Sequence, residues 1–269
     1  MITELTISQQ ENNFRRGLFS MILIEFLLFV FSGVSFQGLE HVAYVNFGID
    51  PVYWLFFLLQ IPQFIFRYHE IGLILDIIIL LLLIYSVFIK ENKFVTWSLF
   101  ILLMLYYVSL TATIGHRNYQ TGFFIMIIPF LFSNQISRKF AFEGIRYFYV
   151  FFYFSSGLFK IFNNGIFEPL LLPSTLKQQF IPYYLEFNTG LRTFMNSLLI
   201  RHERIAFLLY FISSIVETTF VVGFFTKKWD YVLGLLLICF HFSNWVIMDI
   251  AAIGQLAVIF FFLRYKESN

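Results

Sequence analysis

The sequence predicts an all-α, polytopic integral membrane protein, a helical bundle with about eight transmembrane helices and one interfacial or re-entrant segment. Three observations lead to this fold class. Hydrophobic residues make up 59% of the 269 residues and charged residues only 13%, the mean hydropathy is +0.78, and apolar runs alternate with basic pairs. Soluble domains contain about half apolar and about a quarter charged residues, so the composition excludes that class.

The expected helices are the apolar runs between charged breaks. A helix needs about 20 apolar residues to cross the hydrocarbon core of a bilayer. In chain order, the runs are 17–36, 71–89, 94–113, 119–133, 145–162, 205–225, 229–248 and 250–263. The fourth and the last are short, and each could be a tilted helix inside the bundle.

We expect 1–269 to form a single membrane domain with no soluble domain. The bundle should cover about 14–263, and 163–204, the longest polar-leaning stretch, should be an extracytoplasmic segment. Residues 1–13 lack the basic region and the cleavage site of a signal peptide, so the first apolar run should remain as a membrane helix.

The basic residues predict the orientation of the bundle. With eight crossings and a cytoplasmic N-terminus, each cytoplasmic loop carries a basic pair, such as Arg15 and Arg16 or Lys227 and Lys228. This is the distribution that the positive-inside rule expects. If 52–66 also crossed, the later pairs would lie outside, so we expect this segment to be interfacial or re-entrant. The expected location is the cell (cytoplasmic or inner) membrane.

Other classes of partner and cofactor are not expected. The net charge of +2 gives no basic surface for nucleic acid, and no two histidines stand at the i, i+4 spacing of a helical metal site. The apolar composition makes the lipid bilayer an expected partner.

A weak internal repeat is visible in the charge pattern. An acid-bearing apolar helix followed by a lysine-containing loop occurs around Asp76 and Lys90 and again around Glu217 and Lys227. The spacings differ by about one turn, so the pattern suggests a duplication and no more.

Lys160 ends an uncharged run that starts after Arg146. At about 1.5 Å of rise per residue, the two residues lie about 21 Å apart along a helix, which places Lys160 near the far side of the hydrocarbon. Apolar surroundings favour the neutral amine of a lysine, which can act as a base. Alternatively, the side chain snorkels, with its stem in lipid and its ammonium at the interface.

Other polar side chains are expected in the middle-to-outer part of the bundle. They are Asp76, His116, Glu217, His241 and Asn244. Because intramembrane ionisable groups face the bundle interior or a wet cavity, we predict an outward-facing pocket in which Lys160 lies close to His116 or His241. The structural alternative is a set of pairs between helices, either Glu217–His241 or Asp76–Lys160.

Three motifs resemble those of a known family. Residues 153–161 read Tyr-Phe-Ser-Ser-Gly-Leu-Phe-Lys-Ile, residues 115–119 read Gly-His-Arg-Asn-Tyr, and residues 240–244 read Phe-His-Phe-Ser-Asn. In order and approximate spacing, the chain resembles the vitamin K-dependent gamma-glutamyl carboxylase superfamily, whose membrane core is also described as the horizontally transferred transmembrane (HTTM) domain. The resemblance covers most of the chain.

The resemblance implies a lipid-soluble cofactor and a set of roles. In that family a reduced quinone and oxygen yield a strong base, carbon dioxide is captured, and a glutamate is carboxylated at its gamma carbon. By resemblance, the cofactor is menaquinol or a vitamin K-like quinol, and Lys160 is the amine that deprotonates it. His241 would hold carbon dioxide or an oxyanion, and His116 and Asn118 would orient the quinone oxygens. The expected quinone-binding set also includes Tyr153, Asp76, Glu217 and Asn244.

Two departures from the family shift the expected reaction. Residues 162–165 read Phe-Asn-Asn-Gly where the family has an acidic and tryptophan-containing cluster, and the sequence contains no large extracytoplasmic C-terminal region for a protein substrate. We therefore expect a quinol-linked reaction rather than glutamate carboxylation. The alternative is a non-enzymatic membrane subunit that stabilises or positions a membrane or extracytoplasmic partner protein. A transporter is a weaker alternative, because no helix shows paired Gly or Pro breaks.

Overall fold

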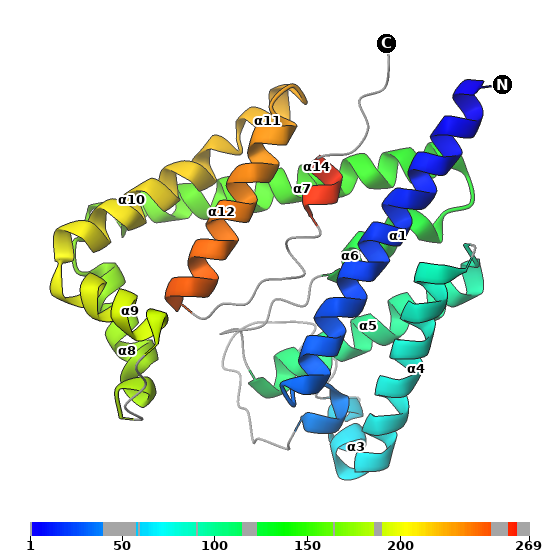
Figure 1. Ribbon diagram of the computed structural model, residues 1–269, viewed down its shortest axis with the longest axis horizontal. Coiled ribbons are helices and arrows are strands. Elements are labelled where there is room, and N and C mark those ends of the chain that lie inside the picture. Colours follow the sequence, from blue (N-terminus) through cyan, green and yellow to red (C-terminus); the bar gives the residue numbers. More distant parts are fainter. Residues whose placement is uncertain are drawn as a thin grey trace. The chain divides into compact units, whose positions relative to one another are not determined.

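The computed structural model describes residues 2–39, 58, 60–89, 91–114, 123–163, 165–185, 190–248 and 258–262. All regular structure in these residues is helical, which confirms the all-α class for the part of the chain described (Figure 1). The helices are α1 (Ile2–Phe31), η1 (Phe36–Gly38), α3 (Ile61–Arg67), α4 (His69–Phe88), α5 (Lys93–Ile114), α6 (Phe123–Leu131), α7 (Gln135–Phe162), η2 (Gly165–Phe167), α8 (Leu171–Leu185), α9 (Leu191–Arg201), α10 (Glu203–Thr219), α11 (Val222–Phe225), α12 (Asp230–Met248) and α14 (Ile259–Phe262).

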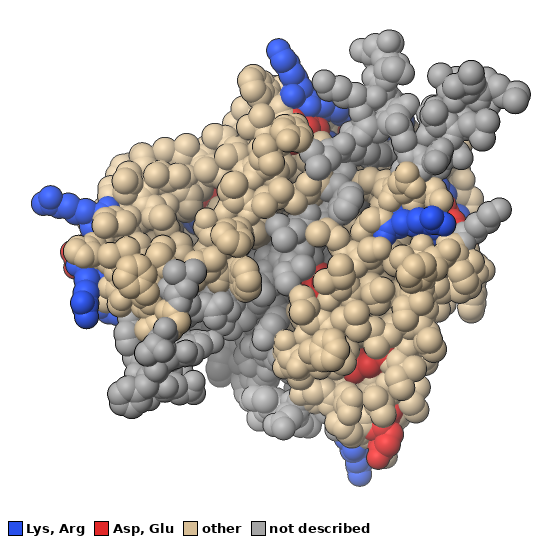
Figure 2. Space-filling model, viewed as in Figure 1, with Lys and Arg blue, Asp and Glu red and all other residues tan. Residues whose placement is uncertain are grey.

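Five described segments are long and apolar enough to cross a membrane. They are Glu11–Gly38, His69–Phe88, Lys93–Leu110, Glu203–Phe225 and Asp230–Ile247. These five match expected spans. Figure 2 shows that uncharged side chains cover most of the described surface on the face drawn. Large apolar side chains such as Phe31, Phe159 and Phe225 are 83%, 69% and 84% exposed, as expected of a surface that meets lipid rather than water.

The other expected spans are described only in part or have other bounds in the structure. Most of 250–263 and the start of 119–133 lie outside the described residues, as do 52–57 and 59 of the segment 52–66. Residues 145–162 are helical, but α7 begins ten residues earlier, at Gln135. Arg138, in the gap between the expected spans 119–133 and 145–162, therefore lies on the first turn of α7.

The described residues form two compact units. The first contains α1 to α6 and the start of α7, up to Phe142, and the second runs from Glu143 to Ala252; both also include short C-terminal pieces. In the first unit, α1 packs against α4 and α5 packs against α6. Tyr106 of α5 lies at its core, with ring centroids 5.4 Å from Phe26 and 5.2 Å from Phe36. Its hydroxyl donates to the Val34 carbonyl at 2.7 Å.

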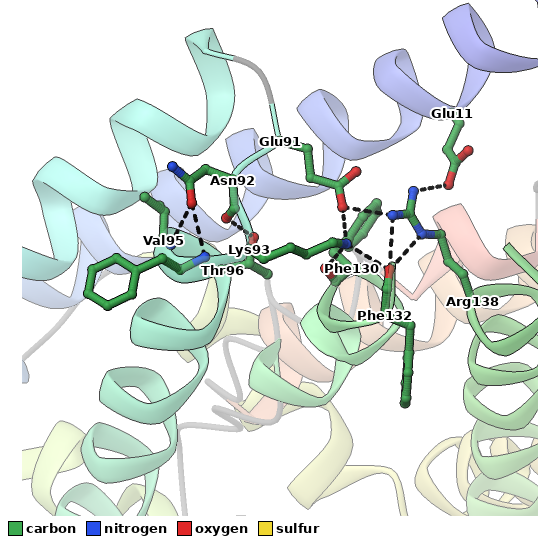
Figure 3. Close-up of polar contacts among 10 residues, drawn as sticks. Glu11, Glu91, Asn92, Lys93, Val95, Thr96, Phe130, Phe132 and Arg138 are labelled. Carbon is green, nitrogen blue, oxygen red and sulfur yellow. Dashed lines mark hydrogen bonds and ion pairs between the residues drawn. The ribbon is translucent and has the colours of Figure 1, made fainter. Parts of the chain in front are cut away.

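A polar clasp in the first unit consists of Glu11, Glu91, Lys93 and Arg138 (Figure 3). Arg138 donates to Glu11 at 2.6 Å and to Glu91 at 2.7 Å. Lys93 pairs with Glu91 and donates to the carbonyl of Phe132, just beyond α6, at 2.7 Å. The clasp joins α1, the turn before α5, the end of α6 and the start of α7.

The second unit has an apolar cluster formed by α8, α9, α10 and α12. Its buried members are Leu172, Leu176, Leu199, Ala206 and Ile247. The expected extracytoplasmic segment 163–204 contains α8 and α9, and its side of the membrane stays a prediction. The prolines at 173 and 182 and the mixed polarity hide these helices from a search for long apolar runs.

Each unit contains an arginine that binds the end of another helix. In the first, Arg15 donates to the carbonyl of Ile89, at the end of α4, at 2.8 Å. In the second, Arg146 donates to the carbonyl of Thr226, which follows α11, at 3.3 Å, and makes two bonds to Asp230 at 2.5 and 2.7 Å. The last carbonyls of a helix lack intrahelical partners and favour a cation. The weak repeat in the sequence, which rests on other residues, stays a prediction.

Candidate functional site

The candidate site lies in the second unit and begins on one face of α7. Tyr153, Ser156 and Lys160 stand three and four residues apart, the spacing that places side chains above one another on a helix. The opposite face of the same segment carries exposed aromatic residues, including Phe151. The sequence of α7 thus separates a polar stripe from an apolar one.

Lys160 forms an ion pair with Glu217 of α10. Its Nζ lies 2.6 Å from Glu217 Oε2, and the Ser156 hydroxyl donates to Oε1 of the same carboxylate at 3.1 Å. The side chain of Glu217 is 5% exposed and that of Lys160 is 21% exposed. A buried carboxylate is costly unless it is paired and hydrogen-bonded. Glu217 is paired with Lys160 and accepts a hydrogen bond from Ser156, so both conditions are met.

Two aromatic rings adjoin the ammonium of Lys160. The ring centroid of Tyr210, on α10, lies 5.3 Å from Nζ, and that of Phe240, on α12, lies 5.9 Å away. Both distances allow a cation–π interaction. The ammonium therefore has a carboxylate and two ring faces around it, supplied by two different helices.

Tyr153 and His241 form a second buried pair. The Tyr153 hydroxyl lies 2.6 Å from His241 Nε2, and the Tyr153 ring packs on Phe220 with centroids 4.8 Å apart. The other ring nitrogen of His241, Nδ1, is buried and has no hydrogen-bond partner among the described residues. The Phe240 ring, which adjoins Lys160, also lies beside Tyr153, with centroids 6.2 Å apart, so the two pairs share one aromatic wall.

Gly157 sets how closely α7 approaches α10. A Cβ at this position would lie 2.5 Å from Thr218 Oγ1, 2.7 Å from the Thr218 backbone nitrogen and 3.1 Å from the Ser214 carbonyl oxygen. Small residues at helix contacts allow such close backbone approach. Only glycine fits here, and the fit brings Lys160 within reach of Glu217.

An apolar groove adjoins the ion pair. It has a volume of about 360 Å³ and is lined by Ile161 of α7 and by residues of α10 that include Phe211 and Thr218. Ile161 follows Lys160 and Thr218 follows Glu217, so the groove and the ion pair occupy adjoining faces of the same two helices. Lys160 itself is not among the lining residues, and the outward-facing pocket at Lys160 remains a prediction.

The structure brings together four of the expected site residues, in pairs that differ from those expected. Lys160 meets Glu217 rather than Asp76, and His241 meets Tyr153 rather than Glu217. Asn244, one turn after His241 on α12, is half-buried. His116 and Asn118 lie outside the described residues.

Asp76 accepts hydrogen bonds from the backbone at the turn after α1. In the first unit its carboxylate accepts the backbone N–H of Phe36 at 3.1 Å and that of Gln37 at 2.9 Å. Gly72, one turn earlier on α4, allows this approach, because a Cβ there would lie 2.9 Å from the Phe36 carbonyl oxygen. We therefore interpret Asp76 as a residue that fixes the turn after α1, and its place in the quinone-binding set stays a prediction.

Sequence reasoning interpreted Ser156 and Gly157 as a close-packing point and assigned no site role to Ser156 or Tyr210. Ser156 is one turn before Lys160, and Tyr210 is two turns before Glu217, so helical spacing alone could have found both. In the part of the chain described, no group of three or more His, Cys, Asp or Glu side chains could hold a metal ion.

No protein-family model, curated protein or solved structure matches this chain.

Chemically, the site holds a carboxylate and an ammonium that are paired and largely shielded from water. The ion pair has no net charge, and uptake of one proton by its carboxylate would leave a hydrogen-bonded acid beside a cation. The site suits transfer of a proton from a hydroxyl to the pair.

Proposed function

We propose that this chain is a multi-pass membrane enzyme similar to the vitamin K-dependent carboxylases, acting on a lipid-soluble quinol. The buried ion pair of Lys160 and Glu217 is the observation that carries the proposal. A lysine in the family-like motif is paired with a carboxylate across a helix contact that only a glycine permits. In membrane segments, ionisable side chains of this kind are by default functional.

The fuller topology is part of the proposal. About eight crossings would place the N-terminus and the basic pairs on the cytoplasmic side of the cell membrane. Arg146 and Lys227 would then lie at the cytoplasmic end of the second unit, and Lys160 toward the opposite side. The site would face the extracytoplasmic side.

The residues present fit a quinol. Its ring needs apolar or aromatic side chains around it, and its oxygens need a few polar groups within hydrogen-bonding distance. Tyr210 and Phe240 supply the walls, and the buried Nδ1 of His241 is a polar atom without a described partner. The nearby groove of about 360 Å³ is within the range of ligand pockets and would suit an apolar tail. When bound, the quinol supplies the reducing electrons for chemistry with oxygen.

The side chains of the chain hold and move the proton. The ion pair accepts a proton from a hydroxyl placed beside it, Ser156 holds the carboxylate in position, and the aromatic rings keep water from the pair. Exclusion of water strengthens the electrostatic interactions at the site.

Oxygen consumption tests the proposal. Protein purified in lipid nanodiscs is given menaquinol, and the rate is compared with that of Lys160→Met. The proposal expects turnover that falls by about 100-fold or more in the variant, the usual range for loss of an acid–base group. Equal rates in the two proteins would overturn it.

A non-enzymatic subunit is the second candidate. The exposed aromatic stripe of α7, which includes Phe151, Phe159 and Phe162 at 57%, 69% and 78% exposure, favours it, because a partner helix could pack there. In that case neither Lys160→Met nor Glu217→Gln would change any rate, while leucine in place of the three phenylalanines would release a stoichiometric partner.

A further inference from the structure

We infer that Glu217 is the proton acceptor of the site and that Lys160 stays a cation throughout. The inference rests on the proposed function and changes the roles that the family resemblance implies, in which the lysine is a neutral base. It follows from what surrounds each of the two charged groups.

The surroundings of Lys160 favour its charged form. Its Nζ lies 2.6 Å from a carboxylate oxygen and faces the rings of Tyr210 and Phe240. Carboxylates and ring faces both attract an ammonium, and neither attracts a neutral amine to the same extent. A lysine that worked as a free base would have to lose all three interactions first.

The surroundings of Glu217 leave its carboxylate able to accept a proton. A carboxylate has about four lone-pair positions, and Ser156 and Lys160 use two of them. The side chain is 5% exposed, so little water solvates its charge.

The step balances without a further reactant. The O–H bond of the substrate breaks, the proton goes to an oxygen of Glu217, and the electron pair stays on the substrate oxygen. The new oxyanion is stabilised by the ammonium of Lys160, which no longer faces an opposing carboxylate. A preorganised cation aimed at developing charge is a common source of rate enhancement.

The charges of Lys160 and Glu217 also indicate the class of substrate. The pair is neutral at rest, so a neutral phenol or hydroquinone can approach it, whereas an anionic substrate would meet the charge of Glu217. The hydroxyl must be acidic enough for a carboxylate to remove its proton. This favours a hydroquinone over an aliphatic alcohol.

Two conservative substitutions separate the roles. Arginine keeps the positive charge but cannot act as a base, because it does not lose its proton in proteins. We expect Lys160→Arg to keep at least about a tenth of the wild-type turnover and Glu217→Gln to lose about 100-fold or more. If Lys160→Arg is as inactive as Lys160→Met while Glu217→Gln remains active, the inference is wrong.

A spectroscopic measurement tests the same point without turnover. In protein carrying ¹⁵N-labelled lysine, the side-chain signal missing from Lys160→Arg belongs to Lys160, and its shift distinguishes an ammonium from an amine. We expect an ammonium in the resting protein, and a neutral amine would overturn the inference. If wild-type protein shows the ammonium but consumes no quinol, the proposed function fails rather than the charge assignment.

Discussion

Lys160 on α7 and Glu217 on α10 form an ion pair 2.6 Å long, although 57 positions separate them in the sequence. Both belong to helices that present apolar residues to their surroundings, and the pair lies where α7 and α10 approach closely, at Gly157. The stability of this helix contact and the chemistry of the site can therefore be tested through the same two side chains.

Removing one partner of the pair should destabilise the protein. Glu217→Leu leaves the ammonium of Lys160 without its carboxylate, at a cost of about 3 kcal/mol. The double variant Lys160→Met/Glu217→Leu should recover most of this loss, because no charge is left unpaired. Unfolding in mixed micelles measures the difference. The exposed pair Lys227–Glu143 is the control, and Lys227→Met should cost less than about 1 kcal/mol.

Gly157 should tolerate no larger residue. Gly157→Ala forces α7 away from α10 and should cost about 1–3 kcal/mol through overpacking. Gly144, on the same helix, has open space where a Cβ would lie, with nothing within 4 Å, so Gly144→Ala should stabilise the helix by about 0.5–1 kcal/mol. Thr218→Ala should not rescue Gly157→Ala, since the backbone nitrogen of Thr218 remains in the way. Thermal unfolding of Gly157→Ala, Gly144→Ala, Thr218→Ala and the double variant Gly157→Ala/Thr218→Ala measures these changes. Full recovery of stability in the double variant would contradict the close backbone contact.

Tyr153→Phe should cost about 1–3 kcal/mol, because it leaves Nε2 of His241 buried without a partner. Tyr147, 40% exposed on another face of α7, supplies the matched control. Tyr147→Phe should change stability by less than about 0.5 kcal/mol. Similar losses in the two variants would show that the hydroxyl of Tyr153 contributes no special interaction.

Asp76 should hold the turn after α1 rather than take part in turnover. Asp76→Ala removes the acceptor of two backbone N–H groups and should cost about 2–3 kcal/mol. Hydrogen exchange at Phe36 and Gln37 should accelerate, while quinol oxidation by the folded fraction stays unchanged. A specific loss of turnover with unaltered exchange would return Asp76 to the site.

Much of the helical framework could be predicted from the sequence, because long apolar runs in water-poor surroundings have few alternatives to helix. The five segments suited to crossing a membrane all contain or closely match expected spans. The prolines and mixed polarity of 171–201 concealed α8 and α9, since these helices are held by tertiary packing through Leu176 and Leu199 rather than by an apolar run.

The members of the site could be predicted better than their partners. Depth along each helix follows from residue counting, and it predicted one group that included Asp76, Lys160, Glu217 and His241; of these, Lys160 and Glu217 are in contact. Which side chains meet depends on the rotation of each helix and on backbone approach. Glu217 meets Lys160 because α7 and α10 approach closely at a glycine. His241 meets Tyr153 because of the position of α12. Neither arrangement can be derived from a single apolar run.

The most direct test of the central claim is the infrared difference spectrum on adding menaquinol to the protein without oxygen. If the ion pair takes the proton, carboxylate absorption should fall and protonated carboxyl absorption should appear. Both changes should be absent from Glu217→Gln. Quinol binding that leaves the carboxyl region unchanged, or that changes it equally in Glu217→Gln, would contradict the account.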